Sequence, residues 1–350
     1  MCVNMKNFRK VNTNSQLSGV IRKEPSDFQV DEIQVFKPSG QGEHVWLLIK
    51  KTSQNTDWVA GLLAKIAEVP RRDVSFAGMK DRHAVTTQWF SVQMPGRVAP
   101  DWQAQLPDGV VLLDEKRHDR KLKRGTLEGN QFKLHIRDFQ GTEDELKTTL
   151  ERITEQGIPN YFGEQRFGFY QADKNAYTNI IKAEQWFKGE IKVKSKQQRS
   201  IYLSAARSWI FNHILSDRVE AGTWNQAQQG DVFMLDGTKS CFFEDLDDSL
   251  TERVQQLKLH PTGALWGRGN LRSNNSVKEN EQKQSKAFNT LCEGLESKGL
   301  KQERKALRLV VNDLNYEWLE DQKSVNLIFS LPAGAFATSV LAELGEFKTS

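Results

Sequence analysis

Residues 75–94, SFAGMKDRHAVTTQWFSVQM, place one carboxylate among basic side chains shortly before a strand. The segment 88–94 alternates apolar and polar residues, which predicts a strand with one apolar face. The segment 55–70 repeats apolar side chains at helical spacing until Pro70 ends the pattern. Asp81 is therefore expected in a connection between a helix and a strand, where chemistry is found more often than within regular elements.

Asp81 stands next to fixed positive charge, because Lys80 and Arg82 flank it and His83 follows. Neighbouring cations favour the ionised form of a carboxylate. An ionised carboxylate without a second acid beside it serves as a nucleophile or as an ion-pair anchor, and it is a poor general acid. Considered alone, the spacing favours a salt bridge that stabilises a loop over a catalytic group.

Further strand patterns occur towards both ends of the chain, at 44–52, 130–139 and 324–331, each with apolar residues at alternate positions. A final helix is predicted over 336–344, after the turn at 332–334. Strands at both ends with only a few helices predict an α+β fold, in which helices cover one side of a sheet.

The middle of the chain has a different composition. Residues 157–170 form a loop rich in glycine and aromatic side chains, 201–219 predict a helix, and 230–237 resemble one arm of a hairpin. Residues 272–285 contain Val277 as their one apolar side chain, which predicts a mobile loop. The changes in composition near 155 and 305 predict a middle domain that is inserted into the outer one.

The basic residues are concentrated in two bands, although the net charge of the 350-residue chain is only +4. Residues 116–137 hold eight Lys and Arg side chains against two acidic ones. The second band consists of Lys188, Lys192, Lys194, Lys196 and Arg199. Two such bands are expected where a phosphate-rich partner binds one face of a protein. Ordinary solvated surface charge is the alternative explanation for either band alone.

The composition also limits the class of protein. A hydrophobic content of 38% and a charged content of 27% are typical of a globular chain. No run approaches the roughly 20 apolar residues that cross a membrane, and the first residues lack the apolar core of a secretory signal. We therefore expect no membrane association and a cytoplasmic location.

Motifs for metals and cofactors are missing from the sequence. The three cysteines and six histidines form no CxxC or HExxH pattern, so we expect no metal site. Neither GxxxxGK[ST] nor GxSxG occurs, and GRG at 267–269 lacks the strand-to-helix context of a dinucleotide site. We therefore expect a protein that works without a cofactor.

Two other segments offer contacts to a nucleobase. In 121–132, KLKRGTLEGNQF, glycines allow close approach and the amide of Asn130 can hydrogen-bond a base edge, although a hairpin turn is the simpler interpretation. In 22–32, Phe28 follows two basic residues and can stack on a base. Most phenylalanines in such a position belong to the core.

Six blocks are spread over nearly the whole length of the chain. They are EPSDFQVDE (24–32), SFAGMKDRHAVTTQW (75–89), KLKRGTLEGNQF (121–132), GIPNYFGEQRFG (157–168), YLSAARSWIFN (202–212) and LPAGAFATSVLAEL (331–344). Together they resemble the tRNA pseudouridine synthase D family. The AGxKD and PNYFGxQRFG blocks are highly specific in combination, so the resemblance reverses the purely structural interpretation of Asp81.

The resemblance implies an enzyme that isomerises uridine to pseudouridine in tRNA, at position 13 in bacterial members, without a cofactor or metal. The uracil is detached from C1′ of its ribose, rotated and rejoined through C5. One aspartate is essential, and the motif match implies that it is Asp81, which either attacks the substrate covalently or promotes elimination to a glycal. A stacked uridine must first be flipped out, which costs a few kcal/mol.

The family motifs also imply residues that hold the flipped nucleotide. By this match, Phe28 and Phe336 contact the nucleotide, Asn130 hydrogen-bonds its base, and Phe132 lines the same pocket.

Basic residues of the same motifs are assigned in the same way. Arg22 stands where the family has a basic residue, often Lys, and can pair with Asp81 or with a phosphate. An Arg differs from a Lys there because its guanidinium is planar and permanently charged. Lys80 is the family's lysine beside the catalytic aspartate and is included among the substrate-binding residues. His83 is expected to have a structural role only.

The implied fold is an α+β catalytic domain with a mixed or antiparallel sheet and flanking helices, interrupted by a second α+β domain. The catalytic domain comprises 1–155 and 307–350, and the inserted domain comprises 156–306. A cleft between them would have the basic stretch 116–137 in its wall. We expect a monomer. The alternative is a non-catalytic RNA-binding or RNA-chaperone protein on the same scaffold, while a metal-dependent RNA-modifying enzyme is disfavoured.

Overall fold

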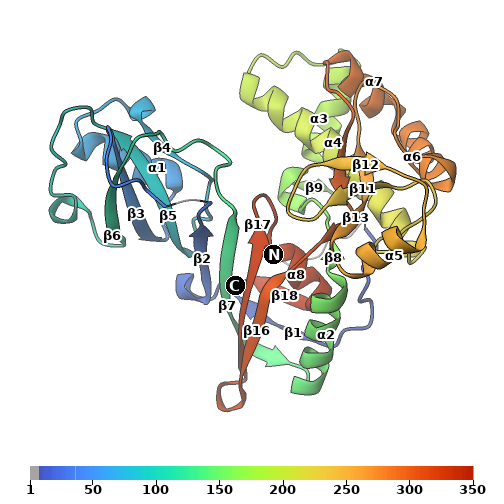
Figure 1. The fold of residues 1–350 in the computed structure, drawn as a ribbon, viewed down its shortest axis with the longest axis horizontal. Coiled ribbons are helices and arrows are strands. Elements are labelled where there is room, and N and C mark those ends of the chain that lie inside the picture. The colour runs from blue at the N-terminus through green and yellow to red at the C-terminus, as the bar shows by residue number, and fades with distance from the viewer. Residues whose placement is uncertain (1–7, 36, 350) are drawn as a thin grey trace.

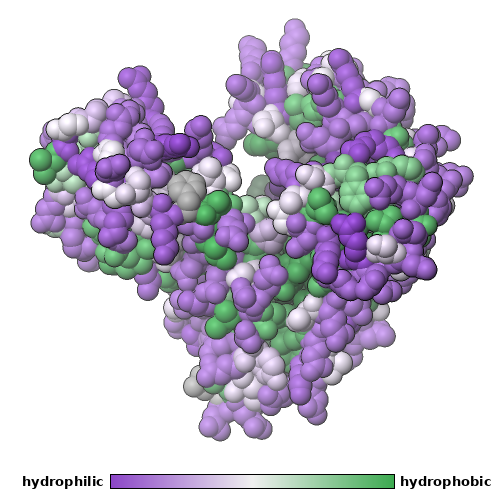
Figure 2. Space-filling model, viewed as in Figure 1, coloured by the Kyte–Doolittle hydropathy of each residue, from purple (hydrophilic) through white to green (hydrophobic). Residues whose placement is uncertain are grey.

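The structure is a computed structural model, and it describes residues 8–35 and 37–349. Figure 1 shows three parts: an N-terminal lobe on the left, a central part below, and an inserted part on the right. The N-terminal lobe comprises 44–118, the inserted part comprises 158–309, and the remaining elements form the central part. The space-filling view is hollowed between the N-terminal lobe and the inserted part (Figure 2).

One ten-stranded sheet runs through the N-terminal lobe and the central part, in the order β16-β17-β7-β2-β5-β3-β6, with β4 beside β5 and with β1 between β7 and β18. Its strands are β1 (Ser18–Ile21), β2 (Phe28–Ile33), β3 (His44–Thr52), β4 (Val74–Phe76), β5 (Val85–Gln93), β6 (Val110–His118), β7 (Gly129–Gln140), β16 (Asn312–Leu319), β17 (Ser324–Pro332) and β18 (Glu346–Thr349). Most neighbouring strands are antiparallel, but β2 pairs with β5, and β1 with β18, in parallel. The sheet is therefore mixed.

The two halves of this sheet have separate cores. In the N-terminal lobe, α1 (Thr56–Ile66) packs against β3, β4 and β5 around Leu47, Leu63 and Phe90. In the central part, α2 (Glu143–Gln156) and α8 (Ala337–Leu344) contribute apolar side chains to a core with β7 and β17. The short parallel pairing of β2 with β5 joins the halves. The loop 77–84, which carries Asp81, enters β5 at this junction.

The inserted part has its own sheet, in the order β12-β11-β13-β14, and five helices among the described residues. Its longer elements are α3 (Thr178–Phe187), α4 (Lys196–Glu220), β11 (Val232–Leu235), β12 (Cys241–Phe243), α5 (Asp248–Gln255), β13 (Leu259–Leu265), α6 (Asn275–Ala287), α7 (Asn289–Ser297) and β14 (Glu303–Ala306). A two-stranded sheet, β9 (Tyr170–Gln171) with β10 (Ala176–Tyr177), precedes α3. The inserted part also contains the single-turn 3₁₀ helix Glu164–Arg166, and the other 3₁₀ helices of the described chain are Pro25–Asp27, Arg71–Asp73, Gln103–Gln105 and Glu320–Gln322.

The chain enters and leaves the inserted part at neighbouring points, because β8 (Ile158–Pro159) pairs with β15 (Arg308–Leu309). The N-terminal segment provides a second link. Phe8 stacks on Tyr161 at 5.5 Å between ring centroids and belongs to the core of the inserted part. A few residues later, the side chain of Ser15 donates to the main-chain carbonyl of Leu344 in α8 at 2.5 Å. The segment 8–17 therefore bridges the inserted and central parts.

The predicted mobile loop at 272–285 is wrong, because α6 covers Asn275–Ala287. This helix docks through polar side chains, which the sequence pattern does not reveal. Glu281 is fully buried, accepts a hydrogen bond from the main-chain N–H of Ala264 at 3.1 Å, and forms an ion pair with Arg304 at 2.8 Å. The buried carboxylate of Glu281 thus anchors α6, although the helix contains few apolar residues.

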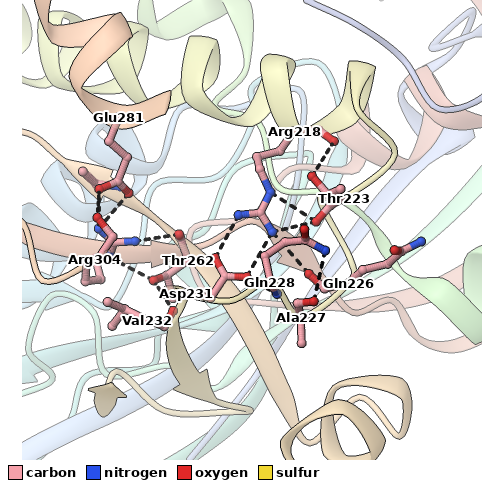
Figure 3. A network of polar contacts seen from close by, with 12 residues as sticks. Arg218, Thr223, Gln226, Ala227, Gln228, Asp231, Val232, Thr262, Glu281 and Arg304 are labelled. Atoms are coloured by element: carbon pink, nitrogen blue, oxygen red, sulfur yellow. Dashed lines mark hydrogen bonds and ion pairs between the residues drawn. The ribbon is translucent and has the colours of Figure 1, made fainter. Parts of the chain in front are cut away.

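A second buried ion pair lies nearby in the same network (Figure 3). Arg218, at the end of α4, contacts Asp231 at 2.8 Å, and the Arg218 and Asp231 side chains are 7% and 0% exposed. Arg218 also donates to the main-chain carbonyl of Thr223 at 2.7 Å. Each buried charge in this network thus has an opposite charge beside it.

The other predicted elements near the site are found close to their expected bounds. The strand predicted at 44–52 is β3, the helix predicted within 55–70 is α1, and the helix at 336–344 is α8. The helix predicted at 201–219 is the C-terminal three-quarters of α4. Among the described residues, no helix has both the length and the apolar character that crossing a membrane requires.

Candidate active site

A cleft of about 1890 Å³ opens between the N-terminal lobe and the inserted part, with the central part as its floor. All three parts contribute to its wall. Asp81 and its loop come from the N-terminal lobe, Asn130 and Phe336 come from the central part, and 234–241 and 302–308 come from the inserted part. The expected basic wall is not found among the described residues: 116–137 contributes residues between Gly125 and Phe132 to the wall, and none of its eight Lys and Arg side chains lines the cleft.

Asp81 stands at this cleft with a guanidinium beside it. Arg22 Nη2 donates to Asp81 Oδ2 at 2.5 Å, although the two residues are 59 positions apart. The Asp81 side chain is 45% exposed and the Arg22 side chain is 19% exposed. Arg22 adopts a left-handed backbone conformation, with a φ of 58°, directly after β1. The ion pair therefore joins the start of the central part to the loop of the N-terminal lobe.

Arg22 also covers the ring of Phe28, with its guanidinium carbon 3.8 Å from the ring centroid. Phe28 itself is buried, and it contacts Phe132 edge-on at 6.2 Å between ring centroids. Phe132 stacks in turn on Phe329 at 5.3 Å. Phe28 and Phe132 thus form an apolar part of the cleft floor, and Phe329 packs against Phe132. Phe28 and Phe132 are both buried, so they shape the cleft but expose little of their rings to it.

Asn130 lies on the same floor and has an unused acceptor. It is only 9% exposed, and its buried Oδ1 has no hydrogen-bond partner among the described residues. Its neighbour Gly129 faces β17 so closely that a Cβ there would overlap the carbonyl oxygen of Leu331. Glycine therefore lets β7 approach β17 at the point where Asn130 enters the cleft. A buried, unpaired amide oxygen is costly unless a ligand supplies a donor.

Phe336 is the most accessible of the predicted contact residues. It precedes α8 as the N-cap residue, lines the cleft, and is 41% exposed. An exposed aromatic ring on a cleft wall offers a surface on which a base can stack.

Lys80 precedes Asp81 in the sequence, but its side chain is paired with a different carboxylate. Its Nζ contacts Glu32 Oε2 at 2.9 Å, and the Lys80 and Glu32 side chains are 5% and 0% exposed. Lys80 therefore ties the loop to β2 through a buried ion pair. The Asp81 carboxylate contacts Arg22. Of the two partners expected for Arg22, Asp81 or a phosphate, the structure therefore shows Asp81.

The comparisons with known proteins agree with one another. A family model described as tRNA pseudouridine synthase D (TruD) matches residues 4–182 and 169–344. A tRNA pseudouridine synthase D from Hydrogenovibrio crunogenus is 48% identical over 331 residues, which cover 95% of this chain and 94% of that protein. One from Methylococcus capsulatus is 46% identical over 330 residues, which cover 94% of this chain and 91% of that protein. The chain belongs to the tRNA pseudouridine synthase D family. The family expected from the six sequence blocks is thereby confirmed.

The fold of the family is confirmed as well. The solved structure of a putative tRNA pseudouridine synthase D from Methanosarcina mazei superposes with a TM-score of 0.70 at 20% identity, and the match covers 98% of this chain and 95% of that one. The predicted α+β catalytic sheet, interrupted by a second α+β part, corresponds to the ten-stranded sheet and the inserted part described above.

Sequence reasoning missed three buried polar residues of this pseudouridine synthase. Lys51, Thr56 and Gln88 are each 0% exposed and lie beneath the Asp81 loop. One signal was available for Lys51. The alternation of Val45, Leu47 and Ile49 on the apolar face of β3 continues to position 51, which places a lysine where an apolar residue is expected.

Proposed function

We propose that this chain isomerises uridine to pseudouridine in tRNA, with Asp81 as the catalytic group and position 13 as the target. The observation that supports the site assignment is the position of the Asp81 carboxylate. It is partly exposed at the cleft and paired with Arg22, and the same cleft is lined by apolar rings, the unpaired amide of Asn130 and the exposed ring of Phe336. The names of the 43–48% identical relatives support tRNA as the substrate.

The cleft has the features that a flipped uridine needs. Extruding a base costs a few kcal/mol, which contacts in the pocket must offset. Phe336 would stack on or wall the flipped nucleotide, while Phe28 and Phe132 would support it from below. The unpaired Oδ1 of Asn130 would accept a hydrogen bond from the N3–H of uracil, which replaces the water or base partner that the uracil loses.

Asp81 would then act at the junction between the sugar and the base. An ionised carboxylate can attack the substrate to form a covalent adduct, or it can remove a proton from the ribose as the uracil leaves and a glycal forms. In either route the uracil rotates and rejoins C1′ through its C5, and the C5 hydrogen is released as a proton. Arg22, with its fixed planar charge, would hold the carboxylate towards the cleft until the substrate arrives.

The organisation of the chain supports this assignment of roles. We propose that 1–155 with 307–350 form the catalytic domain, that 156–306 form the inserted domain, and that the enzyme acts as a cytoplasmic monomer. The basic bands at 116–137 and 188–199 would contact phosphates of the tRNA outside the pocket. Lys80, which is paired with Glu32, would contribute to substrate binding by holding the loop.

Tritium release tests the proposed function directly. A tRNA transcript with tritium at C5 of its uridines is incubated with the purified protein, because joining C5 to the ribose displaces that hydrogen. We expect about one equivalent of tritium per tRNA, and no release from a matched transcript in which cytidine replaces uridine 13. Release from both transcripts would refute the position, and release from neither would refute the activity.

A further inference from the structure

The loop that carries Asp81 rests on buried polar side chains. Gln88 Nε2 donates to the main-chain carbonyl of Gly78 at 3.0 Å, and Gln88 Oε1 accepts from the hydroxyl of Thr56 at 3.0 Å. The Thr56 hydroxyl oxygen accepts in turn from the main-chain N–H of Lys80 at 3.0 Å. The Gly78 carbonyl and the Lys80 N–H, just before Asp81, are therefore hydrogen-bonded to side chains of β5 and α1.

Lys51 completes this arrangement directly under Asp81. Its Nζ donates to the main-chain carbonyl of Asp81 at 3.2 Å and to that of Gln54 at 2.7 Å. The residue is 0% exposed on β3, where its register partners on the two neighbouring strands are Thr86 and Val110. Among the described residues, Lys51 Nζ therefore contacts two carbonyl oxygens. No carboxylate oxygen lies within hydrogen-bond distance of it there.

The charges around Lys51 come from the catalytic loop itself. Burial lowers the pKa of Lys51 to about 8, the Asp81 carboxylate opposes that shift, and Lys80 adds to it. Asp81 is in turn paired with Arg22, and Lys80 is paired with Glu32. A lysine without its own acidic partner is costly to bury. Electrostatic attraction to the Asp81 carboxylate favours the charged form of Lys51.

We propose that Lys51 is a positioning residue for the isomerisation, which fixes the main chain at Asp81 and holds a positive charge behind its carboxylate. This inference rests on the proposed function. Arg22 lies on the cleft side and must adjust when a nucleotide enters, whereas Lys51 lies behind the loop and keeps its contacts. Asp81 would thereby stay oriented towards the ribose after its exposed ion pair has been disturbed.

A dependence on alkaline pH follows from this role. Lys51 is charged below about pH 8 and loses its proton as the pH rises through that value. The turnover rate should therefore fall over this range, because a neutral amine can still donate to both carbonyls but no longer provides the positive charge behind the Asp81 carboxylate. Arg22 keeps its charge throughout, since a guanidinium is effectively always protonated.

The test compares kcat from about pH 6 to about pH 9 in the wild type and three variants. We expect the wild type and Lys50→Met, which changes the exposed neighbour on β3, to lose rate together above about pH 8. Lys51→Arg should keep its rate there, because its charge does not titrate. Lys51→Met should show a kcat reduced by at least tenfold at neutral pH and independent of pH, with the tRNA dissociation constant unchanged.

Three results would overturn the proposal: a wild-type rate that does not fall, a Lys51→Arg rate that falls like the wild type, or a Lys51→Met kcat equal to that of the wild type. Ionisation of the tRNA at high pH affects all four proteins alike, so it leaves the ratio of the Lys51→Arg rate to the wild-type rate unchanged, and this ratio should rise above about pH 8. Thermal unfolding would reveal whether Lys51→Met folds. If it does not, the comparison of the wild type with Lys51→Arg still tests the proposal. A wild type that forms no pseudouridine at any pH refutes the proposed function itself.

Discussion

Two buried ion pairs of the inserted part differ from Lys51, which is buried beneath the Asp81 loop. In the inserted part, Glu281 is paired with Arg304, and Arg218 with Asp231. Beneath the cleft, Lys51 contacts only carbonyl oxygens in the described chain, and the amide oxygen of Asn130 has no partner there. The first arrangement fixes a helix and a turn. In the second arrangement, the charge of Lys51 can act on Asp81 and the amide oxygen of Asn130 can bind a ligand, as expected of a reaction site.

The largest effect should come from breaking a pair in the inserted part. Glu281→Ala leaves Arg304 buried without its partner and removes the acceptor for the main-chain N–H of Ala264, so we expect a loss of about 3–5 kcal/mol in the free energy of unfolding. Chemical denaturation would measure it. Glu279→Ala, on the exposed face of the same helix, is the matched control. Equal stability of the two variants would contradict the role given to the buried pair.

The second prediction concerns the unpaired amide at the cleft. Asn130→Ala should lower kcat/KM by about fivefold, because one hydrogen bond to the base contributes roughly 1 kcal/mol. It should not lower the thermal unfolding temperature, since the Oδ1 that it removes has no partner among the described residues. Asn315→Ala, at an exposed position, is the control. An unchanged rate, or a large loss of stability, would show that Asn130 is structural.

The sequence predicted the outer elements well because their signals are local. Apolar alternation predicted β3, and apolar side chains at helical spacing predicted α1. The helix α6 was missed because it docks through Glu281 and Gln284, and a buried polar side chain looks like surface in the sequence. Composition cannot identify its partner Arg304, which lies 23 residues away.

The candidate site was reached in a different way. The motifs indicated Asp81, Asn130 and Phe336 through resemblance, and the structure brings all three to one cleft. What the motifs could not provide is the direction of each side chain. Lys80, adjacent to Asp81 in sequence, contacts Glu32, while Arg22 reaches Asp81 from 59 residues away. Such contacts depend on the pairing of β2 with β5, which no local pattern encodes.

The most direct test of the account is the Asp81→Asn variant. This substitution keeps the size of the side chain and removes the charged oxygen, so we expect no tritium release from labelled tRNA, with tRNA affinity within about tenfold of the wild type. Asp108→Asn, at an exposed position, should release tritium at the wild-type rate. Turnover by Asp81→Asn comparable to that of Asp108→Asn would contradict the assignment of Asp81 as the catalytic group.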